Sequence, residues 1–305
     1  MPFMKPIHIA IASTTSKPGQ VVQNLQQIRE FAERAGRDGA HLLLTPELSA
    51  SGYGPYPEVL ATAEIAGEGP IFIELSSIAR DNQVAIAAGF VEACNGKRYL
   101  SHYVVFPDGR HVVQRKNRVM LTERPLDPSG QLHPPDTSQP NYDPADPGQP
   151  CQPQFSTFEL AGVRCAVVIC ADAGITRLNE ILAEQRVQLL LLPTGAGGDR
   201  KDRVTTEDLR AEAGRQKYLF WLEKVFFPGP TVIDCIQYRR ALAAVNLCGH
   251  DGLNHYHIGH GSIITPRGEV AALLPGLPNL DRQRPTYAHS VVDVDDCVPA
   301  TVSES

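Results

Sequence analysis

Cys170 is the residue of this sequence best placed to act as a nucleophile. The β-branched run Val167, Val168 and Ile169 predicts a strand that ends at Cys170, and a helical pattern of apolar residues begins at Ile175. The unpaired N–H groups and the dipole at the start of a helix stabilise a thiolate, which is the reactive form of cysteine. Free cysteines are also among the most buried residue types. This stretch alone leaves two interpretations open, a reactive nucleophile and an inert core cysteine.

Two charged residues also follow strand-like runs. The run 41–44 stops at a proline, which places Glu47 at the carboxyl end of a strand, and the run 111–114 is followed closely by Lys116. Ligands bind at this end of the strands in open α/β sheets. A carboxylate can act as a general base, an ammonium can stabilise an oxyanion and a thiol can act as a nucleophile. The alternative for the two charges is a structural ion pair, which would stabilise little.

The elements that must position these residues alternate between strand and helix patterns. Strands are predicted at 7–12, 41–44, 84–91, 98–106, 111–114, 155–160, 163–170, 187–192, 241–247, 258–265, 270–274 and 288–294, and helices at 22–35, 70–81, 175–186, 206–224 and 231–239. This interleaving indicates an α/β fold with helices packed outside paired sheets. We expect one domain over residues 1–305. The proline-rich stretch 125–153 has no apolar period and predicts a long surface loop or lid.

Composition narrows the classes of function. The formal net charge of −6 argues against a nucleic-acid partner. No stretch approaches the roughly 20 apolar residues that a membrane helix needs, and the first apolar run is too short for a signal peptide. Seven cysteines, an odd number without framework spacing, indicate a reducing compartment. The expected location is therefore the cytoplasm, with no membrane partner.

The residues around the three candidates resemble the signatures of the carbon–nitrogen hydrolase (nitrilase) superfamily. The segments Pro46-Glu47-Leu48-Ser49-Ala50-Ser51-Gly52-Tyr53, Arg115-Lys116 and Cys170-Ala171-Asp172 keep the family's order of glutamate, lysine and cysteine, and Asn246-Leu247-Cys248-Gly249 and the run 261–269 also match. The resemblance covers residues 7 to about 295. It implies a four-layer α-β-β-α sandwich, often paired through its helical faces into homodimers or larger assemblies, with no cofactor and no metal.

The resemblance also implies roles for individual residues. Cys170 would form a thioester or thioimidate, Glu47 would move the protons, and Lys116 with the backbone N–H of Ala171 would stabilise the oxyanion. Glu123 is similar to a second glutamate that orients substrate and lysine. Tyr53 would pack behind Glu47, and Asp172 would cap the following helical turn. We expect the substrate-binding residues to be Tyr53, Ala171 and Gly195.

The acid in Cys170-Ala171-Asp172 resembles the amidase branch, so we expect hydrolysis of a small amide or carbamoyl compound. Nitrile hydrolysis is the second hypothesis, and a non-catalytic ligand-binding member of the fold is the third. The sequence departs from the family at Ala171, where an aromatic residue is usual, at 174–177, in the length of 125–153, and in lacking a Glu-Asn pair before Ala243. Because of these departures, the sequence does not predict a specific substrate.

A histidine cluster and a basic run remain outside these signatures. His255 and His257 would share one face of a strand, with His260 nearby, but no neighbouring cysteine or acid pair completes a metal site. We expect a place at the pocket rim or a subunit contact for these histidines. The run 200–203 predicts a solvated loop or, alternatively, an anchor for a substrate carboxylate.

Overall fold

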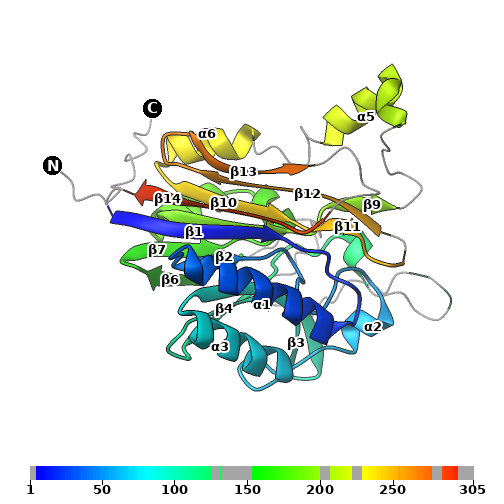
Figure 1. Ribbon diagram of the computed structural model, residues 1–305, viewed down its shortest axis with the longest axis horizontal. Helices are drawn as coiled ribbons and strands as arrows, with labels where there is room; N and C mark the ends of the chain where they lie inside the picture. The colour runs from blue at the N-terminus through cyan, green and yellow to red at the C-terminus, as the bar shows by residue number, and fades with distance from the viewer. Residues whose placement is uncertain are drawn as a thin grey trace.

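Two β-sheets pack face to face, and helices cover the outer face of each (Figure 1). The computed structural model describes residues 5–124, 129, 131, 153–199, 207–221, 229–253, 255–276 and 284–294. Three buried apolar clusters fill the spaces between the four layers, one between the sheets and one under each helical layer. The predicted four-layer α-β-β-α sandwich is confirmed.

The first sheet has the order β14-β1-β2-β3-β4-β5 within the described residues. Its members are β1 (Lys5–Ser13), β2 (Leu42–Leu44), β3 (Ala85–Cys94), β4 (Lys97–Val105), β5 (His111–Arg115) and β14 (Thr286–Val294). β1, β2 and β3 are parallel to one another, whereas β4 and β14 run antiparallel to their neighbours. β5 is antiparallel to β4 and therefore runs in the direction of β2 and β3.

The second sheet has the order β11-β12-β10-β8-β7-β6, and β9 and β13 also pair with β12. Its members are β6 (Thr157–Leu160), β7 (Val163–Val167), β8 (Leu189–Thr194), β9 (Gly197–Asp199), β10 (Ala241–Asn246), β11 (Cys248–His250), β12 (His255–Ile264) and β13 (Val270–Gly276). β7, β8 and β10 are parallel, so their carboxyl ends share one edge.

Helices form the outer layers. The α-helices are α1 (Val21–Arg37), α2 (Pro57–Leu60), α3 (Pro70–Asn82), α4 (Leu178–Glu184), α5 (Glu212–Trp221) and α6 (Gly229–Gln237). Short 3₁₀ turns occur at η1 (Leu121–Glu123), η2 (Cys170–Gly174) and η4 (Asp208–Arg210). α1 and α3 cover the first sheet, α4 and α6 cover the second, and α5 projects away from both (Figure 1). None of the described helices is long and apolar enough to cross a membrane.

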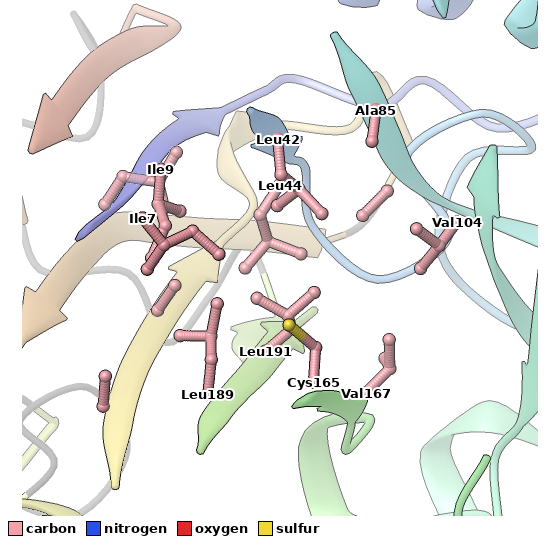
Figure 2. Packing of buried hydrophobic residues seen from close by; sticks show 14 of the residues in the cluster. Ile7, Ile9, Leu42, Leu44, Ala85, Val104, Cys165, Val167, Leu189 and Leu191 are labelled. Atoms are coloured by element: carbon pink, nitrogen blue, oxygen red, sulfur yellow. The ribbon is translucent and has the colours of Figure 1, made fainter. Parts of the chain in front are cut away.

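The alternation of side chains along the strands explains the layering. Ile7 and Ile9 of β1 point into the space between the sheets, whereas Ala10 of the same strand faces α1 and α3. Figure 2 shows Ile7 and Ile9 opposite Leu189 and Leu191 of β8. All four of these large side chains are fully buried, and each contributes about 1.5–3 kcal/mol of transfer free energy. The two sheets therefore form a rigid support for the residues at their edges.

The structure differs from the sequence prediction mainly beside Cys170. β7 ends at Val167, before the predicted end at 170, and α4 begins at Leu178. The 3₁₀ turn η2 separates them. α5 is also shorter than the predicted 206–224, although 206 and 222–224 lie outside the described residues. The predicted loop or lid at 125–153 lies almost wholly outside them, as does the basic run 200–203, and both stay predictions.

Candidate active site

The carboxyl edges of the two sheets bring the candidate residues together. Glu47 follows β2 and Lys116 follows β5, so both lie at the carboxyl edge of the first sheet. Cys170 follows β7 at the carboxyl edge of the second sheet. One side-chain ligand atom each of Glu47, Glu123 and Cys170 lies within 4.8 Å of the others. The structure therefore brings together the carboxylates and the sulfur that the sequence analysis selected.

The ammonium of Lys116 lies at the centre of this group. Its Nζ donates to Oε1 of Glu47 at 2.7 Å and to Oε1 of Glu123 at 2.5 Å. All three side chains are almost completely buried, with at most 2% of their surface exposed. Charges buried to this degree need such partners, because removal from water costs several kcal/mol for each ion. The three charged groups of Glu47, Lys116 and Glu123 are therefore tightly held together.

Burial and the neighbouring charges shift the pKa of both Glu47 and Lys116. Burial raises the pKa of Glu47 to about 7, although the Lys116 ammonium favours its charged form. Burial alone would lower the pKa of Lys116, but the carboxylates of Glu123 and Glu47 keep it well above its usual value. Lys116 is thus a permanent cation, and Glu47 can gain and lose a proton near neutral pH, as a general acid–base group must.

Cys170 is a thiol at rest, contrary to the expectation of a helix-stabilised thiolate. Burial and then the Glu47 carboxylate raise its pKa far above the usual value, and Lys116 and a hydrogen bond from the Gly195 N–H only partly oppose them. The helix also does not begin directly after Cys170, because the five-residue 3₁₀ turn η2 separates Cys170 from α4, which begins at Leu178. The sulfur lies within 4.8 Å of a carboxylate oxygen of Glu47, which places a base close to the thiol proton.

Glu123 is fixed from two sides. Its Oε1 accepts a hydrogen bond from the Tyr53 hydroxyl at 2.8 Å, and its Oε2 accepts one from the backbone N–H of Met120 at 2.9 Å. Tyr53, for which the sequence predicts a place behind Glu47, thus holds Glu123 through its hydroxyl. The Tyr53 ring also lies against Gly195 so closely that a Cβ there would collide with the ring. A glycine is therefore required at Gly195.

Asp172 has a different partner from the one predicted. No side-chain hydrogen bond caps η2. The carboxylate instead accepts the backbone N–H of Asn117 at 3.1 Å and that of Arg118 at 2.7 Å, and is completely buried. Asp172 therefore ties the turn that carries Cys170 to the residues that directly follow Lys116. Burial raises its pKa to about 6 despite these hydrogen bonds.

Two residues in the site have functions that the sequence analysis did not assign. A Cβ at Gly89 would overlap the backbone of Leu48 and Glu47, so only glycine allows the loop that carries Glu47 to lie this close to β3. A lone glycine inside a strand pattern is the available signal for such an approach. Asn246, noted only as part of a motif, is buried and hydrogen-bonded to Thr194 and Ala196 on either side of Gly195.

The histidines of β12 have protein partners. His255 Nδ1 lies 2.9 Å from the Tyr56 hydroxyl, and His260 Nδ1 donates to the carbonyl oxygen of Leu274 at 2.7 Å. The ring of His257 lies edge-on to Tyr53, with centroids 5.2 Å apart. Burial lowers the pKa of His257 to about 4, so it is neutral at pH 7. His255 and His257 share one face as predicted, beside the candidate site.

Among the described residues, one group has the spacing of a metal site: the carboxylates of Glu47 and Glu123 with the sulfur of Cys170. Both carboxylates already bind the ammonium of Lys116. The lysine thus provides the positive charge that a cation would otherwise supply. An oxyanion formed on a carbon attached to the sulfur would lie beside this charge.

Comparison with known proteins identifies the family. The family model for carbon-nitrogen hydrolase matches residues 8–217. The Schizosaccharomyces pombe protein named "Probable nitrilase C965.09" is 26% identical over 298 residues, covering 96% of this chain and 90% of the relative. Omega-amidase NIT2 of Homo sapiens is 26% identical over 258 residues, covering 82% of this chain and 78% of the relative.

Solved structures share the fold. An amidase from Nesterenkonia sp. superposes with a TM-score of 0.66 at 20% identity, covering 98% of this chain and 94% of its own. A variant of the amidase from Nesterenkonia sp. AN1, with a TM-score of 0.64 at 20% identity, covers 93% of this chain and 92% of its own and shows Michael addition of acrylamide at its active-site cysteine. Because the family model covers most of the sequence, the chain belongs to the carbon-nitrogen hydrolase family of the nitrilase superfamily, whose members hydrolyse carbon–nitrogen bonds other than peptide bonds.

Proposed function

We propose that this enzyme hydrolyses the carbon–nitrogen bond of a small linear amide or carbamoyl compound through a thioester on Cys170. The observation that carries the proposal is the buried ammonium of Lys116, held between the carboxylates of Glu47 and Glu123 beside the sulfur. A fixed cation in a water-poor site stabilises the negative charge that an amide oxygen acquires during attack. No further cofactor is required by these steps.

The proposed reaction has two halves. The thiol proton of Cys170 passes to Glu47 as sulfur bonds to the carbonyl carbon, and the oxyanion is stabilised by Lys116 and the backbone N–H of Ala171. Glu47 then protonates the departing nitrogen as the carbon–nitrogen bond breaks. In the second half Glu47 takes a proton from water, the hydroxide oxygen bonds to the thioester carbon, and the thiolate leaves and regains a proton. Carboxylic acid and ammonia or an amine are the products.

The proposed enzyme attacks the carbonyl carbon of an amide in preference to the carbon of a nitrile. Asp172 in the turn after the nucleophile resembles the amidase branch, and the similar proteins include enzymes named omega-amidase and amidase. Asp172 lies at the back of the nucleophile turn, where it sets the position of Cys170 relative to Lys116. Ala171, a small residue next to the nucleophile, with Gly195 and Tyr53 nearby, would line the substrate pocket.

The test is a matched panel of short amides, carbamoyl compounds and the corresponding nitriles. We expect ammonia release from amides and an acyl adduct on Cys170, detected by mass spectrometry after acid quenching. Ammonia from nitriles alone would favour the second hypothesis. No ammonia from any compound, with no adduct on Cys170, would contradict both and leave the non-catalytic ligand-binding hypothesis.

We further propose a homodimer formed through the outer helical face of the second sheet. Ile233 and Ile236 of α6 expose 62% and 52% of their surfaces. Apolar residues gathered on one outer face favour association with a second copy. Light scattering should give a dimer mass for the parent protein and a monomer mass for Ile233→Asp; a monomeric parent would contradict the proposal.

The location proposed is the cytoplasm, with the whole chain acting as one domain. All five cysteines in the described residues are free, including two that are buried in apolar clusters and cannot pair without rearrangement. Free thiols persist in reducing compartments. Fractionation of cells that express the natural protein would test the location.

A further inference from the structure

Two serine side chains attach the loop that carries Glu47 to β3. β2 ends before this loop, so the backbone N–H groups further along β3 need other acceptors. The hydroxyl oxygen of Ser49 accepts the N–H of Gly89 at 3.1 Å, and that of Ser51 accepts the N–H of Val91 at 3.0 Å. Both serines are at most 1% exposed. The two hydroxyls thus take the place of the carbonyl groups that a neighbouring strand would supply.

A continuous chain of hydrogen bonds joins the residues on either side of Glu47. Oγ1 of Thr45 donates to the carbonyl oxygen of Ala87 at 2.8 Å and lies 2.7 Å from Oγ of Ser49. A hydroxyl has one proton, and Thr45 gives its proton to Ala87, so Ser49 is the donor in the second bond. The chain begins at the Gly89 N–H, passes through both hydroxyls and ends on β3 again. It fixes the residues two before and two after Glu47 to the same strand.

The backbone directly after Glu47 has a conformation that needs this support. Leu48 has a φ of 50°, in the left-handed region that is unfavourable for a residue with a side chain. Such a conformation persists only where the surrounding structure determines it. The loop lies so close to β3 that a Cβ at Gly89 would overlap the Leu48 nitrogen. The direction in which the Glu47 side chain leaves the loop therefore depends on the attachment to β3.

The position of the Glu47 carboxylate decides whether it can accept the thiol proton. Its Oε1 accepts a hydrogen bond from Lys116 at 2.7 Å, whereas its Oε2 is buried and has no hydrogen-bond partner among the described residues. A carboxylate oxygen of Glu47 lies within 4.8 Å of the sulfur of Cys170. A general base must come within hydrogen-bond reach of the proton that it takes. A small shift of the loop would therefore change this transfer.

We propose that Ser49 is a positioning residue: with Thr45 it clamps the loop to β3 and so sets the place of the Glu47 carboxylate beside the sulfur. This inference rests on the proposed thioester chemistry. There the carboxylate takes the thiol proton as the carbon–sulfur bond forms and gives it to the nitrogen as the carbon–nitrogen bond breaks. It then takes a proton from the attacking water and returns it to the sulfur as the thioester breaks. A loosened loop would slow all four transfers.

A purely structural role for Ser49 is the alternative, and Ser51 is the matched control. Alanine at either position leaves one buried N–H of β3 without its acceptor, so the two variants should lose similar melting temperature. Ser49 is also bonded to Thr45, so Ser49→Ala in addition opens the chain around Glu47. We expect kcat to fall roughly ten- to a hundredfold in Ser49→Ala at a nearly unchanged KM, and to stay within about threefold of the parent in Ser51→Ala. Equal kcat values in the two variants would overturn the proposal.

The titration of Glu47 reports its position without any substrate. Burial raises the pKa of Glu47 to about 7, and the ammonium of Lys116 opposes this rise. The other titratable side chains around the carboxylate include Glu123, Cys170 and Tyr53, whose hydroxyl is bonded to Glu123. Because the ammonium favours the charged form, a carboxylate that moves away from it should titrate at higher pH.

Carbon-13 NMR of protein labelled at the glutamate carboxyl carbons follows this titration, and Glu47→Gln identifies the signal. We expect the midpoint to rise by at least about half a pH unit in Ser49→Ala and to keep the parent value in Ser51→Ala. An unchanged midpoint in folded Ser49→Ala would overturn the proposal. The titration decides this inference even if the amide panel gives no ammonia and the proposed function fails.

Thr45 supplies a second pair of variants if Ser49→Ala does not fold. Thr45→Val keeps the shape of the side chain and removes the hydroxyl that links Ser49 to Ala87, whereas Thr45→Ser keeps the hydroxyl. We expect the higher midpoint of Glu47 and the lower kcat for valine, and the parent values for serine. Equal midpoints in these two variants would overturn the proposal.

Discussion

At the level of single residues, three buried groups would divide the acid–base work of the proposed reaction. Lys116 keeps its charge because two carboxylates surround it, Cys170 keeps its proton because it is buried next to Glu47, and Glu47 titrates near neutrality. A permanently charged thiolate is therefore not needed. In the proposed reaction the sulfur loses its proton as it attacks a substrate carbon, and Glu47 is the acceptor beside it.

The pH dependence of activity should report Glu47. Burial raises its pKa to about 7, so below that pH the carboxyl group is protonated and cannot accept the thiol proton. We therefore expect kcat/KM to rise with pH through a midpoint near 7 on the acid side. The measurement is initial rates of ammonia release from pH 5 to pH 8 at low substrate concentration. A midpoint near the ordinary carboxyl value of about 4 would contradict this assignment.

Replacing the nucleophile should separate chemistry from folding. Cys170→Ala removes the sulfur and leaves a small residue at a position with φ of 49°, a conformation that strains alanine no more than cysteine. We expect loss of measurable turnover with a melting temperature within a few degrees of the parent. Ammonia release measures the turnover, and thermal unfolding followed by circular dichroism measures the melting temperature. An unfolded variant would show that Cys170 is needed for packing.

At the scale of elements, the turn η2 and the residues after β5 act as one unit. Asp172 joins them through the backbone N–H groups of Asn117 and Arg118, so Cys170 and Lys116 are held at a fixed separation. These two segments come from different sheets. A change at Asp172 should therefore disturb the relative position of nucleophile and cation although it touches neither.

Asp172→Asn tests this connection. The amide oxygen of asparagine can accept one of these hydrogen bonds, but its amide nitrogen would then face a backbone donor. We therefore expect the free energy of unfolding to fall by about 1–3 kcal/mol. We also expect kcat to fall at least about tenfold, because Cys170 and Lys116 would be misplaced relative to each other. Denaturant unfolding and initial rates give the two values. The control is Asp108→Asn, whose carboxylate accepts the N–H of Arg110 in an exposed turn and should leave kcat unchanged. Equal effects of the two variants would contradict the role of Asp172.

The limits of sequence-based prediction also lie at this scale. Apolar periodicity located β1, β3, α1 and α3 because their patterns are long and regular. It placed the end of the strand at Cys170 and the start of the helix at Ile175, whereas β7 ends at Val167 and α4 begins at Leu178, because apolar residues continue through Val168 and Ile169 and resume at Ile175. The partner of Asp172 was missed because it lies 55 residues away in sequence, and local rules favour a cap on the nearest helix.

At the scale of the molecule, the stability of the sandwich and the geometry of the site are separable. The four layers follow from the alternation of apolar residues and from the family resemblance, and the sequence alone predicts Glu47, Lys116, Glu123 and Cys170 as candidates. The tie between Asn246 and the residues beside Gly195 could not be predicted, because the register of β8 and β10 is a property of the assembled sheet.

A core substitution far from the site should show this separation. Ile9 is fully buried between the sheets near the middle of β1. We expect Ile9→Ala to lower the free energy of unfolding by about 2–5 kcal/mol through lost burial and a cavity. Below the unfolding transition, kcat/KM should stay within about threefold of the parent. Denaturant titration and initial rates at 25 °C check this, and a large fall in kcat/KM of folded protein would contradict it.

The groups to which we assign the reaction come from opposite sheets: Glu47 and Lys116 follow β2 and β5, and Cys170 follows β7. During synthesis and folding, a chain in which only one sheet has formed would thus carry either a thiol without its proton acceptor or a carboxylate without a nucleophile. Hydrolytic activity would therefore arise only when the two sheets have packed against each other. Partly folded copies would be harmless to the amides around them.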